Sequence, residues 1–191
     1  MKRAERLPQL AQVIDADLAA RRFGVRELTL TTHAIVGAAI ACVLPAHPYL
    51  VIAAAFASHF LLDAIPHWDY PLRSDSVNPK VAAAMKYDRA LLADMLTIGT
   101  DALLGIALAL FLLATPGDSF LVLCAASAAI LPDALQFAYI KFPREPLVSL
   151  QRFHVWMHAS RSLRERPILG LSAQIGLVLF TLIIARLVAS S

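Results

Sequence analysis

The chain has 191 residues, of which 59% are hydrophobic and 16% are charged, and its formal net charge is +3. The mean hydropathy of +0.65 is higher than the core of a soluble domain requires. This composition excludes an ordinary soluble domain and indicates an all-α integral membrane protein built as a single membrane domain over residues 1–191. The two cysteines, Cys42 and Cys124, lie in apolar stretches and offer no disulfide framework.

The first 26 residues are expected to form an amphipathic helix that lies along the membrane surface. Within residues 1–26, apolar side chains recur on one helical stripe at Leu7, Leu10, Ile14 and Leu18.

A first helical hairpin is expected over residues 28–67. No Asp, Glu, Lys or Arg occurs from Leu28 to Leu62, and the turn Pro45-Ala46-His47-Pro48 divides this stretch. It has room for two membrane spans of roughly 17–20 residues each.

A loop over residues 68–89 separates this hairpin from a second one over residues 90–140. Its two apolar stretches, about 90–114 and 119–140, are divided by the helix-breaking turn Thr115-Pro116-Gly117-Asp118. A fifth apolar stretch covers residues 168–189, so the sequence predicts about five transmembrane helices.

The two hairpins look like an internal repeat. Thr32-His33 is followed by Gly37 at the same spacing as Thr100-Asp101 is followed by Gly105. Further along each copy, a second ionisable residue directly follows a proline: His67 in the first copy and Asp133 in the second. The sequence therefore predicts a duplicated hairpin with an ionisable residue at matched positions.

Lysine and arginine distribution predicts the orientation. Six lie in residues 1–26, four between His67 and Leu91, and six between Lys141 and Arg166, whereas neither short hairpin turn carries any. By the positive-inside rule, the N-terminus and both long loops face the cytoplasm. The basic charge is explained by this topology, so no nucleic-acid partner is expected; membrane lipids are the expected partners.

This topology brings the ionisable residues of the apolar segments to one membrane face. His59, Asp63 and His67 are spaced by four residues, so a continuous helix would place them on one face, although Pro66 can end that helix first. Residues 141–166 are expected to form an interfacial helix that carries His154 and His158 one turn apart.

The predicted metal ligands are histidines and aspartates from both hairpins and the interfacial helix: His33, His59, Asp63, His67, Asp101, Asp133, His154 and His158. Three carboxylates and five imidazoles exceed the four ligands of one zinc ion, so two or more divalent transition-metal ions are expected. Zinc is favoured, and manganese or iron also suits nitrogen and oxygen ligands.

Other roles remain open for single members of this set. Asp101 can pair with an arginine such as Arg89, and Asp133 beside Pro132 can end a helix. His154 and His158 can be ordinary interfacial residues. A carboxylate inside a span, such as Asp63, is costly to insert and is functional by default.

No serine or cysteine nucleophile stands out, and a metal-bound water would serve as the nucleophile. Because the predicted ligands lie at the level of the lipid headgroups on the cytoplasmic side, the expected substrate is a phosphoester such as a lipid headgroup.

Three short motifs carry a resemblance to a known family. Thr32-His33-x-x-x-Gly37, Ser58-His59-x-x-x-Asp63 and Leu131-Pro132-Asp133 resemble motifs of the bacterial inner-membrane metal-dependent hydrolases, which are distantly related to zinc-dependent phospholipase C and P1-type nucleases. The resemblance implies a helical, multi-metal phosphoesterase of a bacterial inner membrane.

Two other classes of function remain. Ionisable residues in spans also form the pathways of metal-ion or proton-coupled transporters. A non-catalytic membrane scaffold would use the same residues only to pair helices and would bind no metal.

Overall fold

The computed structural model describes residues 29–68, 88–158, 163 and 165–189, and the described part of the chain forms six helices. The predicted amphipathic helix in residues 1–26 lies outside the described residues, as does most of the loop 68–89. The helices are α2 (Leu30–Val43), α3 (Pro48–Asp63), α4 (Arg89–Leu113), α5 (Ser119–Lys141), α6 (Leu147–Met157) and α7 (Pro167–Ala189). No strand occurs among these residues, which confirms the all-α class.

Three of the helices, α4, α5 and α7, are long and apolar enough to cross a membrane. Each begins and ends within a residue of the stretch expected from hydropathy. The turn between α4 and α5 is closed by Asp118, whose side chain accepts a hydrogen bond from the amide of Thr115 at 2.6 Å. The apolar stretches and their turn residues are therefore sufficient to define these elements.

The first hairpin is shorter than the sequence indicates. Helices α2 and α3 contain 14 and 16 residues, or about 21 and 24 Å of helix, whereas the hydrocarbon core of a bilayer is about 30 Å thick. Helix α3 begins with Pro48 in its first turn and ends at Asp63, three residues before Pro66. The structure thus provides three helices of spanning length, and the two spans expected in the first hairpin stay a prediction.

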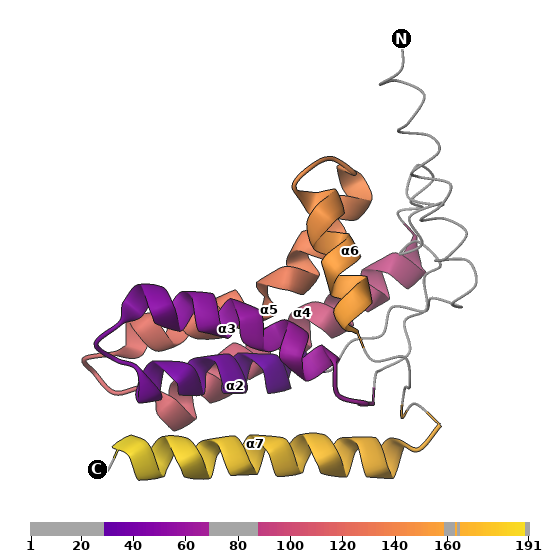
Figure 1. Ribbon diagram of the computed structural model, residues 1–191. Coiled ribbons are helices and arrows are strands. Elements are labelled where there is room, and N and C mark those ends of the chain that lie inside the picture. The colour runs from indigo at the N-terminus through magenta and orange to yellow at the C-terminus, as the bar shows by residue number, and fades with distance from the viewer. Residues whose placement is uncertain (1–28, 69–87, 159–162, 164, 190–191) are drawn as a thin grey trace.

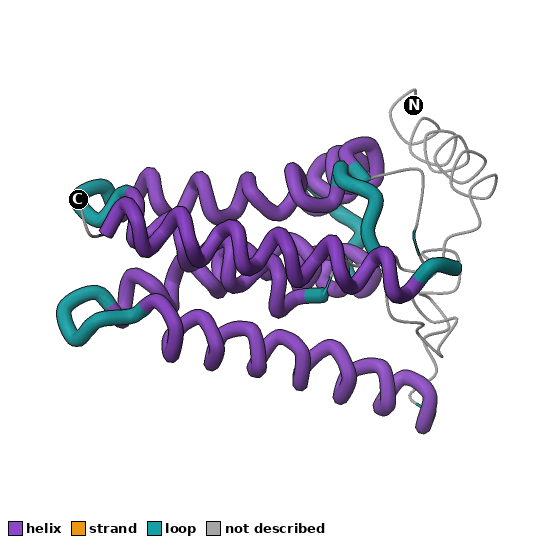
Figure 2. Tube along the Cα trace, turned by 90° about the horizontal axis from the view of Figure 1, so that it is seen from below, coloured by secondary structure: helices purple, strands orange, loops and turns teal. Residues whose placement is uncertain are grey.

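The two hairpins lie side by side with their turns at the same end of the molecule (Figure 1). Figure 2 shows the same bundle from below, with the long helices running nearly parallel. Helix α2 is the central element, since it packs against α3, α4, α5 and α7. Its neighbours approach closely because the core is rich in alanine, including Ala34, Ala38, Ala55, Ala125 and Ala129.

The matched glycines of the repeat both lie at close helix contacts. A Cβ atom on Gly37 would collide with Ala129 of α5, and one on Gly105 would collide with the backbone of Thr31 in α2. The glycine of each repeat therefore permits a close approach of α2 to its neighbour in the second hairpin.

Helix α2 begins well inside the length of the longer helices (Figure 1). Thr31 contacts Asp101, which lies about 12 residues into α4, and Thr29 contacts Gln174, which lies about 7 residues into α7. At 1.5 Å per residue, α4 and α7 extend past the start of α2 by roughly 18 and 10 Å. The side chains near the start of α2 are consequently recessed within the bundle.

Helix α5 contains Pro132 and continues to Lys141. A proline inside a helix removes one backbone hydrogen bond and bends the helix. The last part of α5 rises away from the other helices, and α6 runs back beside it toward the end of α3 (Figure 1). Proline therefore accompanies a bend here and does not end the helix at Asp133.

Candidate metal centre

The ring of His59 is oriented by a backbone carbonyl of the neighbouring hairpin. Its Nδ1 lies 2.8 Å from the carbonyl oxygen of Ala129, in the turn of α5 that Pro132 disturbs. A carbonyl can only accept, so Nδ1 donates its hydrogen. In neutral His59 the lone pair is therefore on Nε2, the arrangement found in most metal-binding histidines.

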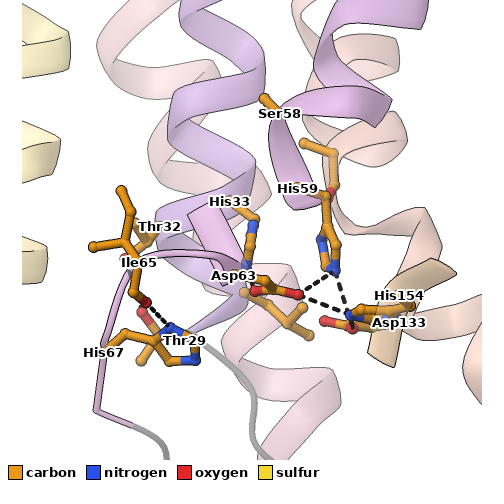
Figure 3. A network of polar contacts seen from close by, with 12 residues as sticks. Thr29, Thr32, His33, Ser58, His59, Asp63, Ile65, His67, Asp133 and His154 are labelled. Atoms are coloured by element: carbon orange, nitrogen blue, oxygen red, sulfur yellow. Dashed lines mark hydrogen bonds and ion pairs between the residues drawn. The ribbon is translucent and has the colours of Figure 1, made fainter. Parts of the chain in front are cut away.

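Two carboxylates face this Nε2 atom. It lies 3.2 Å from Asp63 Oδ2 and 3.2 Å from Asp133 Oδ1. Asp63 is the last residue of α3, and Asp133 lies in α5, so the two hairpins meet at this point (Figure 3). All three side chains are buried.

His154 brings α6 into the same cluster. Its Nε2 lies 2.8 Å from Asp63 Oδ2 and 3.8 Å from Asp133 Oδ1. Phe60 supports this position, since its ring packs edge-on against His154 at 5.4 Å and against Phe153 at 4.9 Å between ring centroids. A helix is thus present within residues 141–166 as α6, and it contributes the buried His154 to the cluster; its interfacial position stays a prediction.

His33 completes the inner cluster from α2. Its ring stacks on His59 with 4.2 Å between ring centroids, and its Nε2 lies 3.2 Å from Asp63 Oδ1. His33 is fully buried. Asp63 therefore has histidines at both carboxylate oxygens, contributed by α2, α3 and α6.

Several nitrogen and oxygen atoms of this cluster are buried without a hydrogen-bond partner among the described residues: His33 Nδ1 and Nε2, His59 Nε2, Asp63 Oδ1 and Asp133 Oδ2. Buried polar groups in proteins are normally satisfied, and each exception needs a physical explanation. Two buried carboxylates also need compensating positive charge. Protons on the histidines or a bound cation would supply it.

Four of these residues have the chemistry of a metal site. One ligand atom each from His59, Asp63, Asp133 and His154 lies within 4.8 Å of the other three, and all four side chains are buried. We call this set the four-ligand group. Two nitrogens and two carboxylate oxygens suit zinc, manganese or iron.

A second set shares Asp63 with the first. Asp63, His67 and His158 also offer ligand atoms within 4.8 Å of one another, and we call this set the three-ligand group. His67 lies beyond the end of α3, so the expected continuous helix face stops at Asp63. The chain after α3 nevertheless returns His67 to the cluster, with its Nδ1 bonded to the carbonyl of Ile65 at 2.6 Å.

Asp101 has a different role from its counterpart His33. Its carboxylate accepts hydrogen bonds from the amides of Leu30 at 2.6 Å and Thr31 at 3.3 Å, and from the hydroxyl of Thr31 at 2.6 Å. These contacts satisfy free amides at the start of α2. Asp101 thus caps α2. Neither metal-binding group contains Asp101 or His33, but His33 contacts Asp63 within the cluster, whereas Asp101 lies at the start of α2.

A supporting contact from α7 is not evident from the sequence. Gln174 is buried; its amide nitrogen donates to the carbonyl of Trp68 at 2.7 Å, and its amide oxygen accepts from Thr29 at 3.0 Å. A glutamine in an apolar span indicates a hydrogen bond between helices. Which segments it joins depends on the tertiary structure.

Comparison of the chain with protein-family models, with curated proteins and with solved structures finds no match. The resemblance to the bacterial inner-membrane hydrolases therefore depends on the short motifs alone. His33, His59, Asp63 and Asp133, the residues those motifs supply, meet within the cluster (Figure 3).

Proposed function

We propose that this protein is a membrane-bound metal-dependent hydrolase that acts on a phosphoester. The observation that supports it best is the lone-pair nitrogen of His59, which faces Asp63 and Asp133 in a buried cluster. A divalent ion at the four-ligand group would compensate the charge of the two carboxylates and bind the unpartnered Nε2 of His59. Metal bound in the cluster would activate water at neutral pH and stabilise charge on the phosphoryl oxygens.

The surroundings of the cluster favour a lipid as the phosphoester. Large apolar side chains are exposed on both elements beside the cluster, with Leu61 and Ile65 at the end of α3 and Phe153 and Trp156 on α6. The cluster is also recessed among helices of membrane-spanning length. The acyl chains of a lipid can stay in an apolar environment beside these side chains while its phosphoester reaches the cluster. The charge bias of the loops supports a cytoplasmic location for this end of the bundle.

The test measures bound metal and hydrolysis on the same purified protein. We expect at least one tightly bound transition metal by elemental analysis, and phosphate or headgroup release from mixed lipid vesicles that stops when a chelator is added. Asp63→Ala should remove most of the bound metal and lower activity by about 100-fold or more, because even outer-sphere changes cost about 10–100-fold in metal affinity or activity.

His47→Ala is the matched control, since His47 is exposed at the start of α3, in the hairpin turn at the opposite end of that helix from Asp63. It should behave as the unmodified protein. Full metal occupancy in Asp63→Ala would contradict the proposed centre. Metal binding without hydrolysis of any phosphoester would contradict the proposed activity.

The recessed position also suits metal-ion transport, which we retain as the second candidate. Ion sites of transporters lie inside the bilayer, where irregular or interrupted helices meet. Uptake of zinc or manganese into vesicles that contain the protein, with no hydrolysis of lipid, would favour this function over the hydrolase.

A further inference from the structure

The two metal-binding groups differ in ligand number and in exposure. The four-ligand group is wholly buried, whereas the three-ligand group includes the half-buried His158. Metal centres with four protein ligands are typically closed, and those with three keep a position for water or substrate. We propose that the cluster binds two metal ions that share Asp63, and that the three-ligand group provides the open position for water and substrate. This inference rests on the proposed function and assigns separate roles within that site.

The two groups are also built on different kinds of backbone. His59, Asp63, Asp133 and His154 lie within helices, where regular hydrogen bonds hold the chain. His67 and His158 lie just beyond the ends of α3 and α6, and their rings pack at 5.1 Å between centroids. The three-ligand group therefore depends on contacts that hold irregular segments in place.

Helix α7 supplies such contacts for His67. Gln174 bonds to the carbonyl of Trp68, the next residue after His67. The carbonyl of His67 itself accepts a hydrogen bond from the amide of Leu163 at 2.8 Å, just before α7. Gly170 lies directly against Trp68, and a Cβ atom there would collide with the Trp68 side chain. Through these contacts, α7 fixes the position of His67.

Gln174 also connects this segment to the start of α2. Its oxygen accepts from Thr29, whose hydroxyl lies 2.9 Å from that of Thr32, next to His33. One buried amide thus holds the segment carrying His67 against the helix carrying His33. We therefore assign Gln174 and Gly170 as positioning residues for the three-ligand group.

The experiment is a titration of the metal-free, full-length protein in detergent with Co²⁺, followed by visible absorption. The unmodified protein should bind two ions, and inorganic phosphate should change the absorption of the second ion only. Gln174→Leu, which keeps the volume but removes both hydrogen bonds, should raise the Kd of the second ion about tenfold or more and leave the first unchanged.

Gly170→Ala and His158→Ala should weaken the same ion, which keeps the test decisive if one variant fails to fold. Gly176→Ala is the matched control on α7, because no atom lies within 4 Å of its added Cβ. It should retain both ions at unchanged affinity. Circular dichroism and a single elution peak on gel filtration identify variants that are folded.

Separate outcomes overturn the two proposals. A single ion in the unmodified protein, or equal weakening of both ions in folded Gln174→Leu, would overturn the two-ion assignment. Unchanged affinity for the second ion in Gln174→Leu and Gly170→Ala would overturn the role of α7. Two ions with the expected phosphate response, but no hydrolysis of any phosphoester, would support this inference and contradict the proposed hydrolase.

Discussion

Asp101 and Asp133 show how the role of an aspartate depends on its surroundings. Both belong to the second hairpin and both match a histidine of the first. Asp133 faces His59 in a buried cluster, whereas Asp101 binds the free amides that begin α2. The favourable end of a helix for a carboxylate is its N-terminus, where the free amides carry partial positive charge. The same residue type is thus a candidate ligand in one position and a helix cap in the other.

These two roles predict different consequences of substitution. Asp101→Ala should lower the free energy of unfolding by about 1–2 kcal/mol, the usual effect of losing a cap, and should leave bound metal unchanged. Asp133→Asn should remove most of the bound metal. Thermal unfolding in detergent and elemental analysis of both variants provide the comparison. Loss of metal in a folded Asp101→Ala variant would show that Asp101 belongs to the centre after all.

At the scale of whole elements, the short central helix organises the molecule. Helix α2 packs against four other helices, and small residues let these helices approach. Gly37 lies against Ala125 and Ala129 of α5, the helix that also carries Asp133. Close packing of α2 on α5 therefore contributes to the position of His33 beside the carboxylates.

Glycine substitutions should separate packing from helix propensity. Gly99→Ala in α4 places a Cβ with no atom within 4 Å, so it should raise stability by up to about 1 kcal/mol through helix propensity. Gly37→Ala should lower stability by about 1–2 kcal/mol, because overpacking exceeds that gain. Opposite signs in thermal unfolding would support the packing argument. Equal, positive changes would contradict it.

At the scale of the whole molecule, the turns of the two hairpins lie at the same end, and the cluster lies at the opposite end of α2 and α3 (Figure 1). Residues 1–26, 67–91 and 141–166 carry 16 of the 17 lysines and arginines, so the predicted orientation places the cluster nearer the cytoplasm.

Cysteine labelling tests this orientation. In a background without Cys42 and Cys124, Gly117→Cys, in the exposed turn between α4 and α5, should react with an impermeant maleimide added to intact cells. Arg144→Cys, exposed between α5 and α6, should react only after the membrane is permeabilised. The reverse pattern would contradict the proposed topology and move the cluster to the outer side.

Hydropathy and turn residues were sufficient to predict the limits of α4, α5 and α7, because long apolar stretches have few other stable arrangements in a membrane. The same signals overestimated the lengths of α2 and α3. Apolar residues next to Pro45 and Pro66 raise the hydropathy of these stretches, but they lie outside the helices. The spacing of His59 and Asp63 within one helix was also readable from the sequence. His67 was expected on the same helix face, and it reaches the cluster only through the chain beyond that helix.

By itself, the sequence determined the helical class, the three long apolar helices and seven of the eight candidate ligands that the two metal-binding groups and His33 bring together. Only the tertiary structure decided that Asp101 caps α2, that Asp63 is shared between two groups, and that Gln174 holds the segment of His67. The physical reason is distance along the chain. Periodicity reports contacts within one helix, whereas a partner 71 or 106 residues away depends on how the helices pack.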